Sequence, residues 1–196
     1  ENLPTTENVR VHGHSRGGAV VLEAIRQRPE LYANADIVLE ASVLPQGQLH
    51  ALASALLEPV SHGMWPWVIR FINSTPSSSY GQSFFGKMNA RKKQLLNKLF
   101  TSTKDHLTIV RNIENIMTWM EKTSFDVYDH INHGTFLIPK VDRILDRGAM
   151  LTSAENSPNS VRIIETQASS HFITLDSQEW LPTLDTMPEI RLQAAQ

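Results

Sequence analysis

The chain has 196 residues, of which 41% are hydrophobic and 19% charged, the proportions of a globular protein with one substantial core. Its 18 basic and 20 acidic residues give a formal net charge of −2, which argues against nucleic acid or an anionic membrane surface as a partner. There is no cysteine, so disulfides and thiolate chemistry are excluded, and no apolar run approaches the roughly 18 residues of a membrane span.

Four short apolar runs alternate with helical patterns along the chain. The predicted strands cover residues 8–12, 36–41, 135–138 and 161–166. A helix over 17–27 follows the first strand and ends before Pro29. Because the connections between these strands are a dozen residues or longer, the pattern predicts an α/β fold with a parallel sheet.

The turn between the first strand and its helix reads Gly13-His14-Ser15-Arg16-Gly17, a G-x-S-x-G motif. A serine on such a sharp turn is held in a strained conformation with its Oγ exposed at the top of the sheet. We expect the flanking glycines to be required because a Cβ there would collide with the neighbouring strand and helix. The position between a strand pattern and a helix pattern favours a nucleophile elbow over an ordinary glycine-rich turn.

About 90 residues with little strand signal separate the second strand from the third. They include an aromatic-rich run over 64–71, with Trp65, Trp67 and Phe71, and helical patterns over 89–100 and 105–122. The last helix is predicted to have one apolar face, formed by Leu107, Val110, Ile113, Met117 and Met120.

Two interpretations of this block are open: a helical bundle that packs its own core, or a helical cap that covers Ser15 and lines an apolar substrate pocket. An insertion of this size between two strands favours the cap. The sequence therefore predicts a core formed by residues 1–42 and 131–196 and a cap over 43–130. The charged run 91–93 predicts an exposed helix face.

A nucleophilic serine needs a base, normally a histidine oriented by a carboxylate. His171 follows the fourth strand, in a loop suited to presenting its ring over the sheet edge. Asp142 follows the third strand, and catalytic groups gather at the carboxyl ends of parallel strands. Asp146 is expected to cap the next helix instead, and Glu40, at the end of the second strand, is a weaker alternative acid.

Two other features remain open. His14 and Arg16 flank the serine; we expect His14 to contact substrate, although both residues could serve only to shape the turn. His130 and His133 have an i, i+3 spacing that could hold a metal ion, but no third ligand accompanies them, so we expect solvated histidines and no metal site.

Residues 13–18, the Asp142 loop and residues 169–172 resemble the elbow, acid turn and histidine loop of the α/β-hydrolase superfamily. The resemblance covers residues 1–42 and 130–180, and the middle block resembles that superfamily's helical cap in position only. It implies the C-terminal strands of an α/β-hydrolase-type parallel sheet with a helical cap insertion. It also implies a serine hydrolase in which Ser15 is the nucleophile, Asp142 the orienting acid and His171 the base.

The resemblance further implies that the main-chain N–H of Arg16 is one oxyanion donor, and that neither metal nor organic cofactor is needed. The substrate expected from it is a small ester with an apolar acyl or alcohol group, cleaved through an acyl-enzyme on Ser15. An alternative is a non-catalytic fragment or a degenerate hydrolase that acts as a binding module.

The sequence departs from that superfamily ahead of the elbow. Only 14 residues precede Ser15, so the upstream strands and the His-Gly type of oxyanion loop are absent. An unpaired parallel strand would leave main-chain groups and apolar side chains exposed. We therefore expect an N-terminal polypeptide segment of the same protein to pair with the first strand and to complete the oxyanion hole, and we expect little esterase activity from this chain alone.

Overall fold

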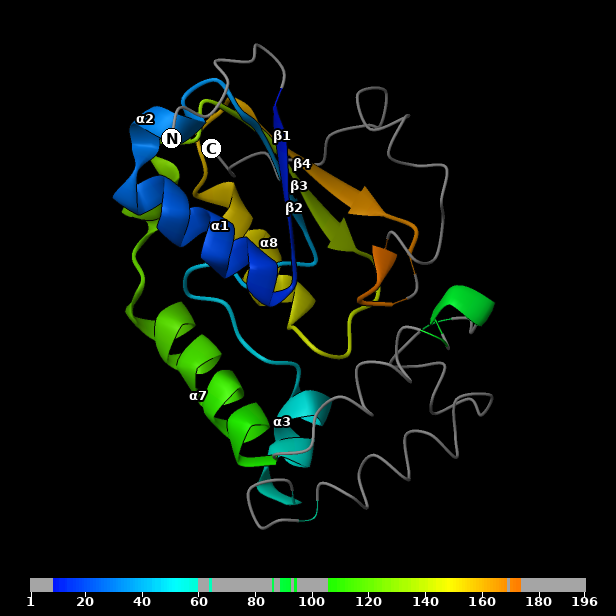
Figure 1. Ribbon diagram of the computed structural model, residues 1–196. Coiled ribbons are helices and arrows are strands. Elements are labelled where there is room, and N and C mark those ends of the chain that lie inside the picture. The colour runs from blue at the N-terminus through cyan, green and yellow to red at the C-terminus, as the bar shows by residue number, and fades with distance from the viewer. Residues whose placement is uncertain are drawn as a thin grey trace, which may run out of the picture.

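The computed structural model describes residues 9–59, 64, 86, 89–92, 94, 106–168 and 170–173, and its centre is a four-stranded parallel sheet (Figure 1). The strands are β1 (Arg10–His14), β2 (Asp36–Glu40), β3 (His133–Pro139) and β4 (Val161–Thr166), and they lie in this order across the sheet. The four predicted strands and the parallel sheet are confirmed.

The predicted position of the first strand is shifted by two residues. β1 ends at His14 rather than at residue 12, because its pairing with β2 continues into the serine motif, with Gly13 opposite Leu39 and His14 opposite Glu40. The strand therefore delivers Ser15 directly at the carboxyl edge of the sheet.

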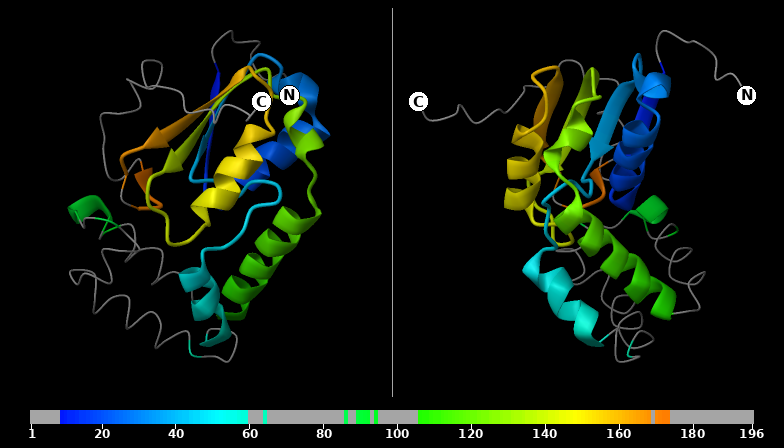
Figure 2. Two further views of the ribbon diagram at one scale, coloured as in Figure 1. Left: turned by 180° about the vertical axis from the view of Figure 1, so that it is seen from behind. Right: turned by 90° about the vertical axis from the view of Figure 1, so that its left-hand side faces the viewer.

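Helices α1 (Arg16–Gln27) and α8 (Arg147–Glu155) cover one face of the sheet (Figures 1 and 2). The short helices α2 (Pro29–Tyr32) and η2 (Phe125–Tyr128) complete this layer. The buried core beneath them includes Leu22 and Ile25 of α1, Met150 and Ala154 of α8, and Ile37, Leu39, Phe136, Ile138 and Ile163 of the strands. Each large apolar side chain buried here contributes about 1.5–3 kcal/mol to folding.

The opposite face of the sheet changes character from one edge to the other. Towards β4 it is apolar, because Val38, Leu137 and Ile164 pack with Ile173. At β1 the same face carries His12 and His14, since alternate residues of a strand point to the same side. The polar part of this face thus lies next to the serine turn.

Helices α3 (Ala51–Pro59) and α7 (His106–Lys122) lie beyond the carboxyl ends of the strands (Figures 1 and 2). The end of α7 packs into the core on the α1 side through Trp119 and Met120, whereas Met117 is 43% exposed. The predicted apolar face of this helix is therefore buried at Met120 and exposed at Met117. The boundary of the cap at residue 130 stays a prediction, although Met120 already belongs to the core of the sheet.

No helix in the part of the chain that the structure describes is long and apolar enough to cross a membrane. Among the same residues, β1 forms one edge of the sheet, with β2 as its only neighbour. The predicted lid aromatics Trp65, Trp67 and Phe71 lie outside the described residues, as does the tail from residue 174 onward.

Candidate active site

Ser15 occupies the turn between β1 and α1 in a conformation that non-glycine residues rarely adopt. Its φ is 53° and its ψ is −124°, and such a backbone costs on the order of 1–3 kcal/mol. The end of β2 holds it in place: the Ser15 N–H donates to the Glu40 carbonyl at 3.1 Å, and the Ser15 carbonyl accepts from the Val43 N–H at 3.0 Å. The strained turn that the motif predicts is present.

The glycines of the turn differ in how much they are needed. A Cβ on Gly13 would lie 2.9 Å from main-chain atoms of Gly17 and Gly18, and one on Gly18 would overlap the side chain of Ser42. A Cβ on Gly17 would meet nothing within 4 Å. The expectation that Gly17 is required on steric grounds is therefore wrong, and Gly18 has that role because α1 passes directly over Ser42.

Arg16 is the first residue of α1, so its main-chain N–H lies in the first turn, where N–H groups have no partner within the helix. That position suits an oxyanion donor beside Ser15. The Arg16 side chain points elsewhere, and its Nη1 donates to Oδ1 of Asn112 in α7 at 3.1 Å. Helix α7 therefore contacts the residue that follows the serine.

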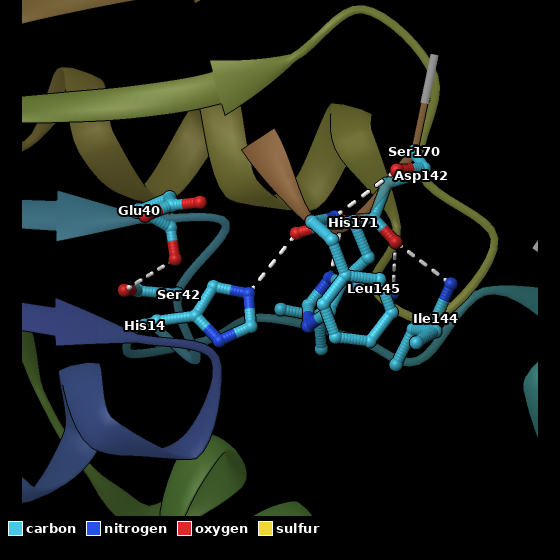
Figure 3. A network of polar contacts seen from close by, with 9 residues as sticks. His14, Glu40, Ser42, Asp142, Ile144, Leu145, Ser170 and His171 are labelled. Atoms are coloured by element: carbon cyan, nitrogen blue, oxygen red, sulfur yellow. Dashed lines mark hydrogen bonds and ion pairs between the residues drawn. The ribbon is translucent and has the colours of Figure 1, made fainter. Parts of the chain in front are cut away.

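Asp142 and His171 form a buried pair at the same edge of the sheet (Figure 3). Nδ1 of His171 lies 2.7 Å from Oδ2 of Asp142, and these residues are 1% and 4% exposed. The other carboxylate oxygen of Asp142 accepts from the N–H groups of Ile144 and Leu145, at 2.7 and 3.0 Å. An ionised carboxylate can only accept, so Nδ1 of His171 is the donor in this bond and Nε2 is the ring nitrogen left without a role in the pair.

The loop that carries Asp142 is fastened to the segment after β2. Leu145 forms a bridge with Leu49, and the Asp146 N–H donates to the carbonyl of Gln48 at 2.8 Å. The side chain of Asp146 caps α8 by accepting from the Ala149 N–H at 2.8 Å, as predicted. The two aspartates thus have different partners: Asp142 binds the ring of His171, and Asp146 caps helix α8.

Nε2 of His171 is buried and makes no hydrogen bond to any residue that the structure describes, Ser15 included. A buried polar atom without a partner is uncommon and points to a role beyond folding. In the absence of substrate, the bond between a nucleophile and its base is often long or unformed. The arrangement leaves Nε2 of His171 oriented and without a partner at the edge of the sheet that presents Ser15.

Glu40 is not the acid of this site. Its Oε2 lies 2.9 Å from Nε2 of His12, within β1 and β2, and the carboxylate that contacts His171 is that of Asp142. The alternative assignment of Glu40 is wrong because its side chain leaves β2 on the face shared with His12 and turns towards β1.

His14 contacts the loop that carries His171. Its Nε2 lies 3.1 Å from the carbonyl oxygen of His171, and the two rings are 5.0 Å apart (Figure 3). Burial lowers the pKa of His14, and the adjacent imidazole of His171 lowers it further. The predicted contact of His14 with substrate stays a prediction; one of its ring nitrogens is engaged with the protein itself.

The position of Lys92 differs from the one that the sequence predicts. The charged run 91–93 predicted an exposed helix face, yet Lys92 is completely buried and its Nζ lies 3.4 Å from Oγ of Ser170. A Cβ on Gly86 would lie 2.9 Å from the same hydroxyl. The block between β2 and β3 therefore packs against the residue that precedes His171, and a charged run gives no sign of this in the sequence.

His130 and His133 are both exposed, at the end of η2 and the start of β3. Among the described residues no group of three or more histidine, aspartate or glutamate side chains could hold a metal ion.

No family model matches the chain, and no curated protein matches it by sequence. Solved structures do match. The 2-hydroxy-6-oxo-6-phenylhexa-2,4-dienoate hydrolase from Rhodococcus sp. strain RHA1 superposes with a TM-score of 0.61 at 17% identity, over 92% of this chain and 63% of that one.

A serine hydrolase from Cycloclasticus zankles gives a TM-score of 0.62 at 14% identity, over 91% of this chain and 62% of that one. A carboxylesterase from Bacillus subtilis gives 0.60 at 10% identity, over 93% and 60%. The chain thus spans about three-fifths of the length of each of these three proteins.

Proposed function

Because the chain has the fold of the α/β-hydrolases, we propose that it is a serine hydrolase with Ser15, Asp142 and His171 as its catalytic residues. The observation that carries the proposal is the state of His171. One ring nitrogen is bound to a buried carboxylate at 2.7 Å, and the other is buried and without a partner among the described residues. This is the condition in which an imidazole accepts the proton of a serine hydroxyl.

In the proposed reaction the Ser15 Oγ attacks the carbonyl carbon of the substrate as Nε2 of His171 takes the hydroxyl proton. The Asp142 carboxylate stabilises the imidazolium that forms. The Arg16 N–H binds the developing oxyanion. The imidazolium then gives its proton to the leaving group, and water, deprotonated by the same nitrogen, releases the acid from Ser15.

The proposed substrate is a carboxylic ester with an apolar acyl or alcohol group. The chemistry of the site supports an acyl transfer, and the contact of α7 with Arg16 supports placing part of the inserted block beside the serine turn. Among the structural neighbours, one is named a carboxylesterase. Residues 43–130 are the proposed cap over this site.

We further propose that a polypeptide segment pairs with β1 and supplies the second oxyanion donor. Among the described residues β1 stands at the sheet edge, and Val9, which directly precedes it, is 41% exposed. Exposed apolar side chains next to an open strand favour a further layer of chain.

The proposal is tested by labelling with a fluorophosphonate probe, which reacts with an activated serine. Wild-type protein is expected to be labelled at Ser15, and Ser15→Ala is expected to lose labelling and to lower ester hydrolysis by about 10⁴- to 10⁶-fold. Labelling that survives in Ser15→Ala, or a wild-type protein that never reacts while its fold is intact, would contradict the proposal and favour the binding-module alternative.

The segment proposal has its own readout. The 196-residue chain alone is expected to hydrolyse short esters about 10²- to 10³-fold more slowly than a version that includes the pairing segment, since one oxyanion donor contributes that much. Full activity of the chain alone, as a monomer in size-exclusion chromatography, would overturn it.

A further inference from the structure

The last side chain of β1 joins the nucleophile's strand to the base's loop. His14 lies opposite Glu40 in the sheet, and its Nε2 is 3.1 Å from the carbonyl oxygen of His171. A carbonyl oxygen only accepts hydrogen bonds, so Nε2 of His14 is the donor. The bond spans 157 residues of sequence and connects the neighbour of Ser15 to the main chain of the base.

We propose that His14 is a positioning residue for the catalytic base, which holds the His171 loop over Ser15 through this main-chain hydrogen bond. The inference rests on the proposed function, because it assigns His14 a part in the reaction of Ser15 and His171. The role proposed here for His14 is a contact with the protein's own His171 loop, whereas the sequence predicted a contact with substrate.

The topology explains why such a bond is needed. The base follows β4, which lies three strands from β1, about 14 Å across the sheet. At Ala168 the loop lies beside the residues that follow β3, because the Ala168 carbonyl accepts from the Val141 N–H at 3.4 Å. To reach Ser15, the loop then has to extend back towards β1. The side chain of His14 extends from β1 towards the loop and meets it at the carbonyl of His171.

The two attachments of His171 act on different parts of the residue. Asp142 binds the ring through Nδ1, and a ring held only there can rock about that bond. His14 binds the main-chain carbonyl, from a different strand. Together they fix both the loop and the direction of Nε2, and a displacement of about 1 Å at a reacting group can cost on the order of 10²-fold in rate.

The surroundings of His14 keep it a neutral donor. The titratable groups that face it are His12 on its own strand, Glu40 on β2 and His171 on the loop. Burial and the two imidazoles lower the pKa of His14, and Glu40 opposes them only in part. A neutral His14 donates its hydrogen bond without placing a second positive charge beside a base that becomes an imidazolium in each cycle.

The experiment measures the rate of fluorophosphonate labelling of Ser15 per folded molecule in the full protein. His14→Leu removes the donor and is expected to label about ten- to a hundredfold more slowly. His14→Gln places an amide N–H near the position of Nε2 and is expected to remain within about threefold of wild type. His14→Asn keeps the amide but is too short to reach, and is expected to behave like the leucine variant.

His12→Gln is the matched control, because His12 lies on the same strand and face but pairs with Glu40 instead of the loop. It is expected to label at the wild-type rate. Thermal unfolding of every variant gives the folded fraction, and the asparagine variant keeps the comparison usable if the leucine variant fails to fold.

Equal labelling rates for wild type, His14→Asn and His14→Leu would overturn the inference and leave the proposed function standing. So would a glutamine variant as slow as the asparagine variant. A wild-type protein that is folded but not labelled at Ser15 would instead overturn the proposed function.

Discussion

The serine turn and the histidine loop meet at one edge of the sheet, but they are built in different ways. The turn is fixed by its own backbone and by the end of the neighbouring strand, through Ser15, Gly18 and Ser42. The loop is fixed by side chains from distant parts of the chain, namely Asp142 after β3, His14 of β1 and Lys92 of the inserted block. The serine turn can therefore be specified by a short motif, whereas the position of His171 depends on the assembled fold.

The largest effect that separates the two regions is expected from Asp142→Asn, which changes only the loop. The asparagine oxygen can keep the bonds from Ile144 and Leu145, so its amide N–H₂ faces Nδ1 of His171. Nδ1 must then accept, the ring proton moves to Nε2, and that nitrogen can no longer act as a base. We expect kcat for ester hydrolysis to fall by about 10⁴-fold with the fold intact.

Asp146→Asn is the matched control for this change. Asp146 lies four residues further on and only caps α8, and asparagine is an equally good cap. Its activity and its unfolding midpoint are expected to match the wild type. If Asp142→Asn kept activity within tenfold of the wild type, the loop would not depend on the Asp142–His171 pair and the contrast between the regions would fail.

The next largest effect is expected in the serine turn, and it is measured as a change in the free energy of unfolding. Gly18→Ala places a methyl group on the side chain of Ser42, so α1 and the segment after β2 have to move apart to admit it. We expect a loss of about 3 kcal/mol in the free energy of unfolding, measured by urea denaturation.

Gly17→Ala, one position earlier, is expected to be neutral or to stabilise by up to about 1 kcal/mol, because its Cβ meets nothing and alanine favours the helix. Opposite signs at adjacent glycines would show that the turn depends on local sterics. Equal losses at both positions would contradict that account.

The same contrast explains what could be predicted from the sequence. Periodicity and turn residues are local signals, so they predicted the four strands, α1, the strained serine and the cap at Asp146. Chain order and strand ends were enough to select Asp142 and His171, which the structure brings to 2.7 Å.

The remaining contacts depend on which segments meet in three dimensions. Nothing next to Lys92 in the sequence marks it as buried against Ser170, and nothing next to His14 identifies the carbonyl of His171 as its partner. The need for Gly18 instead of Gly17 depends on Ser42, which follows a different strand. Partners of this kind come from the register of the sheet and the path of the loops, which no short motif contains.

The smallest expected effect tests whether the backbone of the turn is strained at Ser15. At φ 53° glycine has no steric penalty, so Ser15→Gly should recover strain of about 1–3 kcal/mol and lose about 0.5–1 kcal/mol to the greater freedom of the unfolded chain. We expect a variant that is inactive and about 1 kcal/mol more stable in urea, at an unchanged m-value. Ser54→Gly, in the ordinary helix α3, should instead lose about 0.5 kcal/mol. If Ser15→Gly were the less stable of the two, the serine conformation would carry no strain, and the turn would be held by interactions of the hydroxyl instead of by the backbone around it.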